Sequence, residues 1–312
     1  MAEDQGVNGD RWTTQASILL QKLGWLKVAD SNIDLPGSDG LMHGIDALFR
    51  YEDGFNQPTQ GIFLEAKRYA TTSFSKTKLQ DWVNVLNKKM LELRRSKEFN
   101  AKYPAMAETD PRNGLLVLWF HDLQAYSTFK SKLKDALMNV QTPRGKVMGN
   151  RLFVLSNEDI LRLASLITAL ESWCQTSLPG EQSKFQFYYP SSLAYGNPSQ
   201  YISVLNLEYM FSRFIVARGT SYTQGVEKVS YAVFYFGNLD MDSFINLKEA
   251  LLSHNFPADN TAQLYLYNYQ RNDEFRKIQP DVAKLFTFNS TSVVVKSMDV
   301  FHDLPSWMND VS

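Results

Sequence analysis

The stretch HGIDALFRYEDGFNQPTQGIFLEAKRY (residues 43–69) contains two strand-like segments joined by the turn-rich sequence DGFNQPTQ. These features predict an antiparallel hairpin in which residues 45–52 pair with residues 61–68. Residues that face each other in such a hairpin have a constant sum of residue numbers. Asp46 and Glu65 have their midpoint inside the connecting segment. The sequence therefore predicts two carboxylates side by side on neighbouring strands.

The alternation of side chains along a strand adds a lysine to this pair. Glu65 and Lys67 point to one face of the strand, whereas Ile62, Leu64 and Ala66 point to the other, where a helix can cover them. Like charges opposite each other in a sheet repel, and a bound divalent cation removes that repulsion. Glu65 also heads the only acid–X–lysine triplet in the chain.

This combination of residue types suits phosphodiester hydrolysis. Two carboxylates, with water and substrate phosphate, form a typical environment for Mg²⁺ in phosphoryl-transfer sites. Lys67 is placed to orient or deprotonate an attacking water and to offset negative charge in the transition state.

The motif resembles the PD-(D/E)XK, or restriction-endonuclease-like, nuclease superfamily over roughly residues 10–155. HGID, with Ile45 where the family name has proline, and FLEAK are close to forms found there. The resemblance implies an α/β fold with a mixed sheet flanked by helices. It also implies that Asp46, Glu65 and the carbonyl of Ala66 bind Mg²⁺, that Mn²⁺ can substitute, and that Lys67 is the catalytic lysine.

Several further residues are candidates for the site. Many members of the superfamily add an acid from the first helix, and Gln15 is the candidate for that position here. His43 adjoins the site but is more typical of a structural histidine. Asp34 and Asp39 are alternative acids. We rank them below Asp46 because they are expected in a loop and because their midpoints with Glu65 fall outside the connecting segment.

The coarse element order predicts an α/β chain. Expected helices are DRWTTQASILLQKLG, capped by Asp10; SKTKLQDWVNVLNKKMLELRRSK; residues 123–138; and one beginning near Asn157. Expected strands are WLKVADSNIDL, the hairpin, NGLLVLWF and RLFVLS. Arg68 and the residues that open the second helix are candidates for holding a DNA backbone: Lys76, Lys78 and Gln80.

The 312 residues are enough for two domains, and TSLPGEQSKFQFYYPSSLAYGNPSQ is the best boundary. We expect a nuclease domain at residues 1–178 and a C-terminal α/β domain for partner binding or target recognition at residues 179–312. Strands there are expected at VSYAVFYFG, AQLYLYNY and STSVVVKSM, with helices at MDSFINLKEALLSH and DEFRKIQPDVAKLF. Their aromatic side chains favour core packing over base stacking. Arg213 and Arg218 are weaker nucleic-acid candidates.

Charge and composition indicate the class of protein. The net charge is only −1, but residues 65–150 carry 11 lysines and 5 arginines against 8 acids. Such an excess supports a phosphate-binding face, although a run of charge is more often a solvated helix face. No apolar run is long enough to span a membrane, and the polar N-terminus is unlike a signal peptide. The single cysteine, Cys174, fits a reducing cytoplasm, where we expect the protein.

The sequence thus predicts a cytoplasmic, Mg²⁺-dependent deoxyribonuclease. A weaker likeness to the nuclease subunit of two-gene bacterial anti-phage defence systems implies a second protein subunit or a homodimer. The rival is a non-catalytic DNA-binding or scaffolding subunit with a decayed nuclease fold. DNA is the expected substrate, and the sequence leaves RNA, strandedness and the number of metals open. Nucleotide binding by the C-terminal half is a third possibility, which we rank low because that half lacks a glycine-rich phosphate loop.

Overall fold

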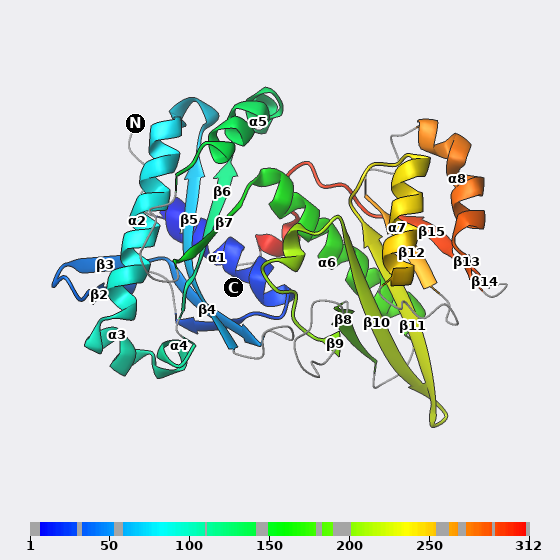
Figure 1. Ribbon diagram of the computed structural model, residues 1–312, viewed down its shortest axis with the longest axis horizontal. Helices are drawn as coiled ribbons and strands as arrows, with labels where there is room; N and C mark the ends of the chain where they lie inside the picture. The colour runs from blue at the N-terminus through cyan, green and yellow to red at the C-terminus, as the bar shows by residue number, and fades with distance from the viewer. Residues whose placement is uncertain are drawn as a thin grey trace. The chain divides into compact units, whose positions relative to one another are not determined.

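A computed structural model gives the fold of the chain (Figure 1) and describes residues 7–29, 33–52, 59–109, 111–141, 149–178, 183–189, 201–253, 262–267, 273–288 and 291–309. The chain forms two compact units. Unit 1 comprises Met1–Glu52, Pro58–Ile160 and His302–Ser312, and unit 2 comprises Asp53–Gln57 and Leu161–Phe301.

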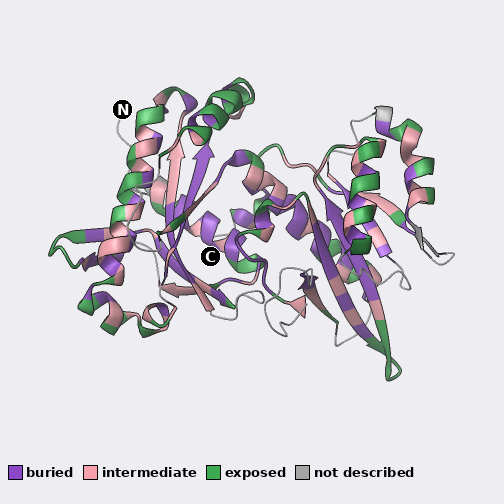
Figure 2. Cartoon of the chain, in the orientation of Figure 1, coloured by how far each residue is buried: buried purple, intermediate pink, exposed green. Residues whose placement is uncertain are grey.

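Unit 1 is built on a five-stranded mixed sheet in the order β1-β4-β5-β6-β7. Its strands are β1 (Leu26–Ala29), β4 (Ala47–Glu52), β5 (Thr59–Tyr69), β6 (Asn113–Phe120) and β7 (Arg151–Leu155). The β1–β4–β5 pairs are antiparallel and the β5–β6–β7 pairs are parallel. β6 is an uninterrupted apolar run and is buried along its whole length, as a central strand flanked on both faces should be (Figure 2).

Helices cover both faces of this sheet. They are α1 (Val7–Lys22), α2 (Lys76–Arg94), α3 (Lys97–Lys102), α4 (Pro104–Ala107), α5 (Leu123–Met138) and the start of α6 (Asn157–Ser177). On one face, α2 and α5 share a core with Phe63, Leu116 and Phe120. On the other face, Trp12 of α1 packs against Trp119, with the ring centroids 5.7 Å apart. The expected mixed sheet flanked by helices is confirmed.

The predicted hairpin is present with the predicted register. β4 and β5 pair antiparallel from Ala47↔Leu64 to Glu52↔Thr59, with the predicted sum of facing residue numbers. The pairing is shorter than predicted, because Asp46 lies one position outside this ladder and not within a strand. The turn itself, residues 53–58, lies outside the described residues. Because a slip of one residue would turn Glu65 to the opposite face, this register is the feature that positions the site.

The segment before the hairpin differs from the prediction. WLKVADSNIDL forms two strands, β1 and β2 (Ile33–Pro36), and β2 pairs with β3 (Met42–Ile45) in a separate two-stranded sheet. Asp34 lies in β2, within the segment predicted as strand, so counting it among the loop acids was wrong. The prediction failed because the Gly- and Ser-rich turn at residues 37–41 has the same composition whether it closes a hairpin or joins distant elements.

The first helix also begins earlier than predicted. Asp10 lies in the first turn of α1 instead of capping it. The apolar residues that recur at helical spacing are all buried: Trp12, Ala16, Leu19, Leu20 and Leu23. Gly24 follows the helix with a φ of 91°, a left-handed conformation that glycine adopts without strain.

Unit 2 contains a six-stranded mixed sheet in the order β15-β12-β11-β10-β8-β9. The strands are β8 (Lys184–Tyr188), β9 (Tyr201–Ile202), β10 (Phe214–Thr223), β11 (Val226–Tyr235), β12 (Ala262–Leu266) and β15 (Val294–Ser297). Helices α7 (Met241–Ser253) and α8 (Asp273–Leu285) share a core with one sheet face, and β13 (Thr287–Phe288) pairs with β14 (Thr291–Ser292). The expected second α/β unit is confirmed, although β8, β9, β10 and β13 were not predicted.

The aromatic strands of unit 2 line its core. Tyr231, Phe234 and Tyr265 are buried, and the last two stack at 5.1 Å. Core packing, the favoured interpretation of these side chains, is therefore confirmed. Arg218 lies over the ring of Tyr201 at 4.9 Å and pairs with Glu227 at 3.7 Å.

Candidate active site

The candidate site forms where the chain passes from β3 to β4 beside the middle of β5. Asp46 is the single residue between these two strands. Its Oδ2 accepts a hydrogen bond of 2.7 Å from the backbone amide of Ala66. This contact anchors the carboxylate to β5 at the point where the β4–β5 ladder ends.

Glu65 is the most buried charged group of the site. Its side chain is 5 % exposed, and its Oε1 lies 2.8 Å from Nζ of Lys67. The short distance follows from strand geometry, because residues i and i+2 of β5 point to the same face. The structure thus brings Asp46, Glu65, Ala66 and Lys67 together, as the sequence predicts.

A second lysine, which sequence reasoning missed, completes the cluster. Lys89 of α2 donates to both Glu65 oxygens, at 3.0 Å to Oε1 and 2.9 Å to Oε2. The available signal was helical spacing: Lys89 lies three residues after Leu86 and four before Leu93, both buried. A lysine on the flank of an apolar stripe can turn its ammonium group toward the sheet.

The pKa of Asp46 reflects two carboxylates that lie close together in a largely buried site. The pKa of the Asp46 carboxyl is raised to about 6, mainly by burial and then by the nearby charge of Glu65. Lys67, the Ala66 amide and Lys89 act in the opposite direction. A carboxyl group with a raised pKa beside a second carboxylate is a site that favours an added positive charge.

The donor set fits a hard divalent cation. Asp46 and Glu65 supply carboxylate oxygens, and the Ala66 carbonyl is close to both in the chain, which is the all-oxygen environment that Mg²⁺ prefers. Among the described residues, no group of three or more His, Cys, Asp and Glu side chains is placed to hold a metal ion. A cation here would therefore need water and substrate oxygens to complete its shell.

The accessory candidates have other partners. Gln15 is buried; its Nε2 donates to Oδ1 of Asn309 at 2.6 Å, and its Oε1 has no hydrogen-bond partner among the described atoms. His43 is buried in β3 and contacts Asp39 at 2.9 Å.

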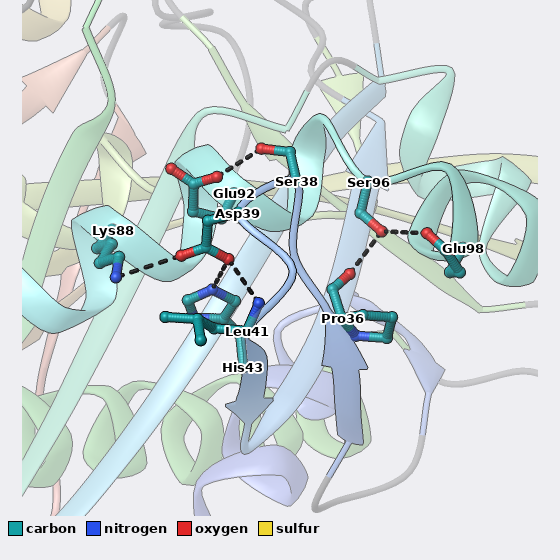
Figure 3. A network of polar contacts seen from close by, with 9 residues as sticks. All are labelled: Pro36, Ser38, Asp39, Leu41, His43, Lys88, Glu92, Ser96 and Glu98. Carbon is teal, nitrogen blue, oxygen red and sulfur yellow. Dashed lines mark hydrogen bonds and ion pairs between the residues drawn. The ribbon is translucent and has the colours of Figure 1, made fainter.

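The His43–Asp39 pair belongs to a polar network that joins the β2–β3 hairpin to α2 (Figure 3). Oδ1 of Asp39 also accepts from the amide of Leu41, and its Oδ2 pairs with Lys88 of α2 at 3.3 Å. The hydrogen bond from His43 lowers the pKa of Asp39 to about 2. These contacts give Asp39 and His43 a role in fixing the hairpin to the helix.

Three of the four predicted DNA-binding residues lie in the first turns of α2, and Arg68 lies in β5. Ser75 caps the helix by accepting from the amide of Lys78, whose ammonium group bonds the carbonyl of Ser73 at 2.7 Å. Lys76 is exposed, whereas Gln80 is tied to the backbone of Gln141 by two hydrogen bonds. By strand alternation, the half-buried Arg68 points to the face opposite Lys67. The four residues therefore do not form one contiguous surface group with the site.

Comparison with known proteins identifies unit 1. No curated protein and no solved structure matches the chain. A family model described as the GAPS4 protein PD-(D/E)XK nuclease domain matches residues 1–159, which include the hairpin, α2 and all three candidate catalytic residues. None of the described helices has the length and apolar character needed to cross a bilayer. The chain belongs to the GAPS4 PD-(D/E)XK nuclease domain family, an anti-phage defence family.

Proposed function

We propose that this chain is a metal-dependent nuclease that hydrolyses phosphodiester bonds of DNA, and that it is the effector subunit of an anti-phage defence complex. The single observation that supports this proposal most strongly is the gathering of Asp46, Glu65 and Lys67 by the β4–β5 register. These residues match the acid, acid and lysine of the family motif.

Each residue has a proposed role. Asp46, Glu65 and the carbonyl of Ala66 would hold Mg²⁺, with Mn²⁺ as a substitute. When bound, the cation supplies positive charge that polarises a phosphoryl oxygen and lowers the pKa of a nearby water. Lys67 would orient the attacking water, assist its deprotonation and offset charge on the phosphoryl group. Gln15 is the candidate accessory residue, whereas we assign His43 to the network that fixes the β2–β3 hairpin to α2.

The basic residues near α2 are proposed to hold the DNA backbone. Lys76 is exposed at the helix start, where backbone amides and the helix dipole favour a phosphate. Lys78 and Gln80 would assist from the first turns of the same helix, and Arg68 would act apart from them, from β5. We assign partner binding or target recognition to the second domain, residues 179–312. The partner would be a second protein subunit or another copy of the chain, in the cytoplasm.

Replacement of Glu65 tests the proposal. Glu65→Gln keeps the shape of a buried side chain but removes its charge, so Mg²⁺-dependent cleavage of linear and circular DNA should fall below detection while the circular dichroism spectrum is unchanged. Lys88→Met, on the neighbouring helix and ion-paired with Asp39, is the matched control and should cleave normally. Cleavage by Glu65→Gln at the parental rate would refute the assignment.

The alternative is a non-catalytic DNA-binding or scaffolding subunit. One observation favours it: Lys89 already compensates the charge of Glu65 in the described structure. A nuclease should show saturable thermal stabilisation by Mg²⁺ or Mn²⁺ that disappears in Asp46→Ala, because a ligand that binds the native state raises its stability. A scaffold should show no such stabilisation in either protein.

A further inference from the structure

Lys89 makes the contact that the family motif does not explain. Its ammonium group lies 2.9 and 3.0 Å from the two oxygens of Glu65, and its side chain is only 16 % exposed. Lys67 already contacts Glu65 from the same strand. The site therefore has two lysines on one proposed metal ligand, so the following inference rests on the proposed function.

Close packing of α2 on the sheet brings Lys89 to Glu65. Gly114 of β6 lies beneath the helix, and a Cβ atom there would be 2.6 Å from Sδ of Met90 and 3.1 Å from Cδ2 of Leu86. These two helix residues flank Lys89 in sequence, so the missing side chain at Gly114 lets this turn of the helix approach β5 and β6. The contact with Glu65 is thus built into the packing of the domain.

The hydrogen bonds of Glu65 leave little room for another cation. A carboxylate oxygen accepts at two lone pairs. Oε1 of Glu65 forms an ion pair with Lys67 and accepts a hydrogen bond from Lys89, and Oε2 accepts a second hydrogen bond from Lys89. A cation bound through Oε1 would displace an ammonium group, and one bound through Oε2 would lie beside that of Lys89. Because these side chains are mostly buried, water only weakly screens the repulsion between the cation and the ammonium groups.

The net charge of the cluster indicates what would relieve this repulsion. With their usual charges, Asp46, Glu65, Lys67 and Lys89 sum to zero. A divalent cation alone would leave the cluster strongly positive. A phosphodiester brings one negative charge and oxygens that can accept a hydrogen bond from an ammonium group.

We propose that Lys89 is a second lysine of the active site that competes with the divalent cation for Glu65 and donates to a phosphate oxygen of the substrate once it is released. Lys89 is therefore a positioning residue for Glu65, and it couples metal binding to DNA binding. The cation binds weakly to the DNA-free protein and more tightly when a phosphodiester is present. The site therefore does not bind the cation fully until a nucleic acid is bound.

Calorimetric titration of the DNA-free protein with Mg²⁺ and Mn²⁺ tests the competition without measuring cleavage. Lys89→Met removes the ammonium group and keeps an apolar stem, so the Kd for metal should fall roughly tenfold, equivalent to about 1.4 kcal/mol. Lys89→Gln should tighten binding in the same direction if Lys89→Met does not fold. Lys89→Arg keeps the charge and should stay close to the parent.

The matched control is the neighbouring residue. Lys88→Met makes the same change in net charge on α2, but Lys88 is 56 % exposed and pairs with Asp39, so its metal affinity should stay within about twofold of the parent. Equal tightening in Lys88→Met and Lys89→Met would mean a general charge effect and would overturn the proposal.

The coupling is measured by repeating the titrations with a short duplex whose phosphorothioate linkages resist hydrolysis. The duplex should tighten metal binding in the parent and in Lys88→Met, and clearly less in Lys89→Met. If Lys89 variants and the parent bind metal identically while Asp46→Asn binds none, the competition is wrong and the proposed nuclease site stands. If no protein binds metal with or without the duplex, both proposals fail.

Discussion

The backbone amide of Ala66 donates a hydrogen bond of 2.7 Å to the carboxylate of Asp46. In an antiparallel hydrogen-bonded pair, the N–H and C=O groups of one residue point toward the same neighbouring strand. The carbonyl of Ala66 is therefore directed to the side of β5 on which Asp46 lies. This relationship supports the proposal that the carbonyl and the carboxylate bind one cation, and it explains why the middle residue of the Glu65–Lys67 motif matters through its backbone.

The charge of Asp46 should cost stability in the metal-free protein. Its pKa is raised from 3.8 to about 6, mainly by burial and then by Glu65, against the opposing effects of Lys67 and Lys89. Between these values the folded state holds a proton that the unfolded state releases. The free energy of unfolding should therefore fall as pH rises through this window, with the full penalty present above pH 6.

Asp46→Asn removes that penalty. In EDTA at pH 7.5 we expect the variant to be more stable than the parent by about 1–3 kcal/mol, and we expect the difference to shrink toward pH 4. Urea denaturation at four pH values measures both quantities. A gain that is constant across the range would mean that packing or hydrogen bonding, not ionisation, is responsible.

Lys67 should matter for catalysis more than for metal binding. Lys67→Met leaves Asp46, Glu65 and the Ala66 carbonyl in place, so saturable stabilisation by Mg²⁺ should persist. The cleavage rate at saturating metal should fall by about 10²–10⁴-fold, the usual contribution of a positioned acid–base group. Rates measured under single-turnover conditions, with Lys88→Met as the charge-matched control, provide the test. Loss of metal binding together with activity would instead assign Lys67 to holding the ligands.

Local periodicity predicted much of the site. The burial of residues 113–120, the helix at residues 123–138 and the register of Ala47 with Leu64 all match the structure. Each depends on a pattern within one or two neighbouring segments: an unbroken apolar run, helical spacing or a hairpin turn. Such patterns decide which side chains share a face, and so they were sufficient to bring Asp46, Glu65 and Lys67 together.

Other features depend on distances between elements that no local pattern contains. The contact between Lys89 and Glu65 requires α2 to approach the sheet closely above Gly114. The β2–β3 sheet requires the chain to leave the main sheet and return at Asp46. In both cases the sequence shows a polar helix residue or a glycine-rich turn, and only tertiary packing determines its role.

The contact between His43 and Asp39 should stabilise the hairpin. His43→Ala removes a buried ring that bonds Asp39 and leaves that carboxylate with Lys88 and the amide of Leu41. We expect a loss of about 1–3 kcal/mol in the free energy of unfolding. Under single-turnover conditions the cleavage rate should remain within about threefold of the parent. A large loss of activity in a fully folded variant would show that His43 acts in the reaction.

The tight contact between α2 and β6 gives a final prediction. Gly114→Ala places a methyl group 2.6 Å from Sδ of Met90 and from Cδ2 of Leu152, so these side chains must move, and we expect α2 to shift away from the sheet with Met90. Overpacking of this kind costs about 1–3 kcal/mol. The shift should also lengthen the contact between Lys89 and Glu65 and so tighten metal binding in the DNA-free protein. Gly149→Ala is the matched control, because a Cβ atom at Gly149 meets nothing within 4 Å. Thermal unfolding and calorimetry on both variants separate the outcomes: a destabilised Gly114→Ala with parental metal affinity would show that helix position does not control access to Glu65.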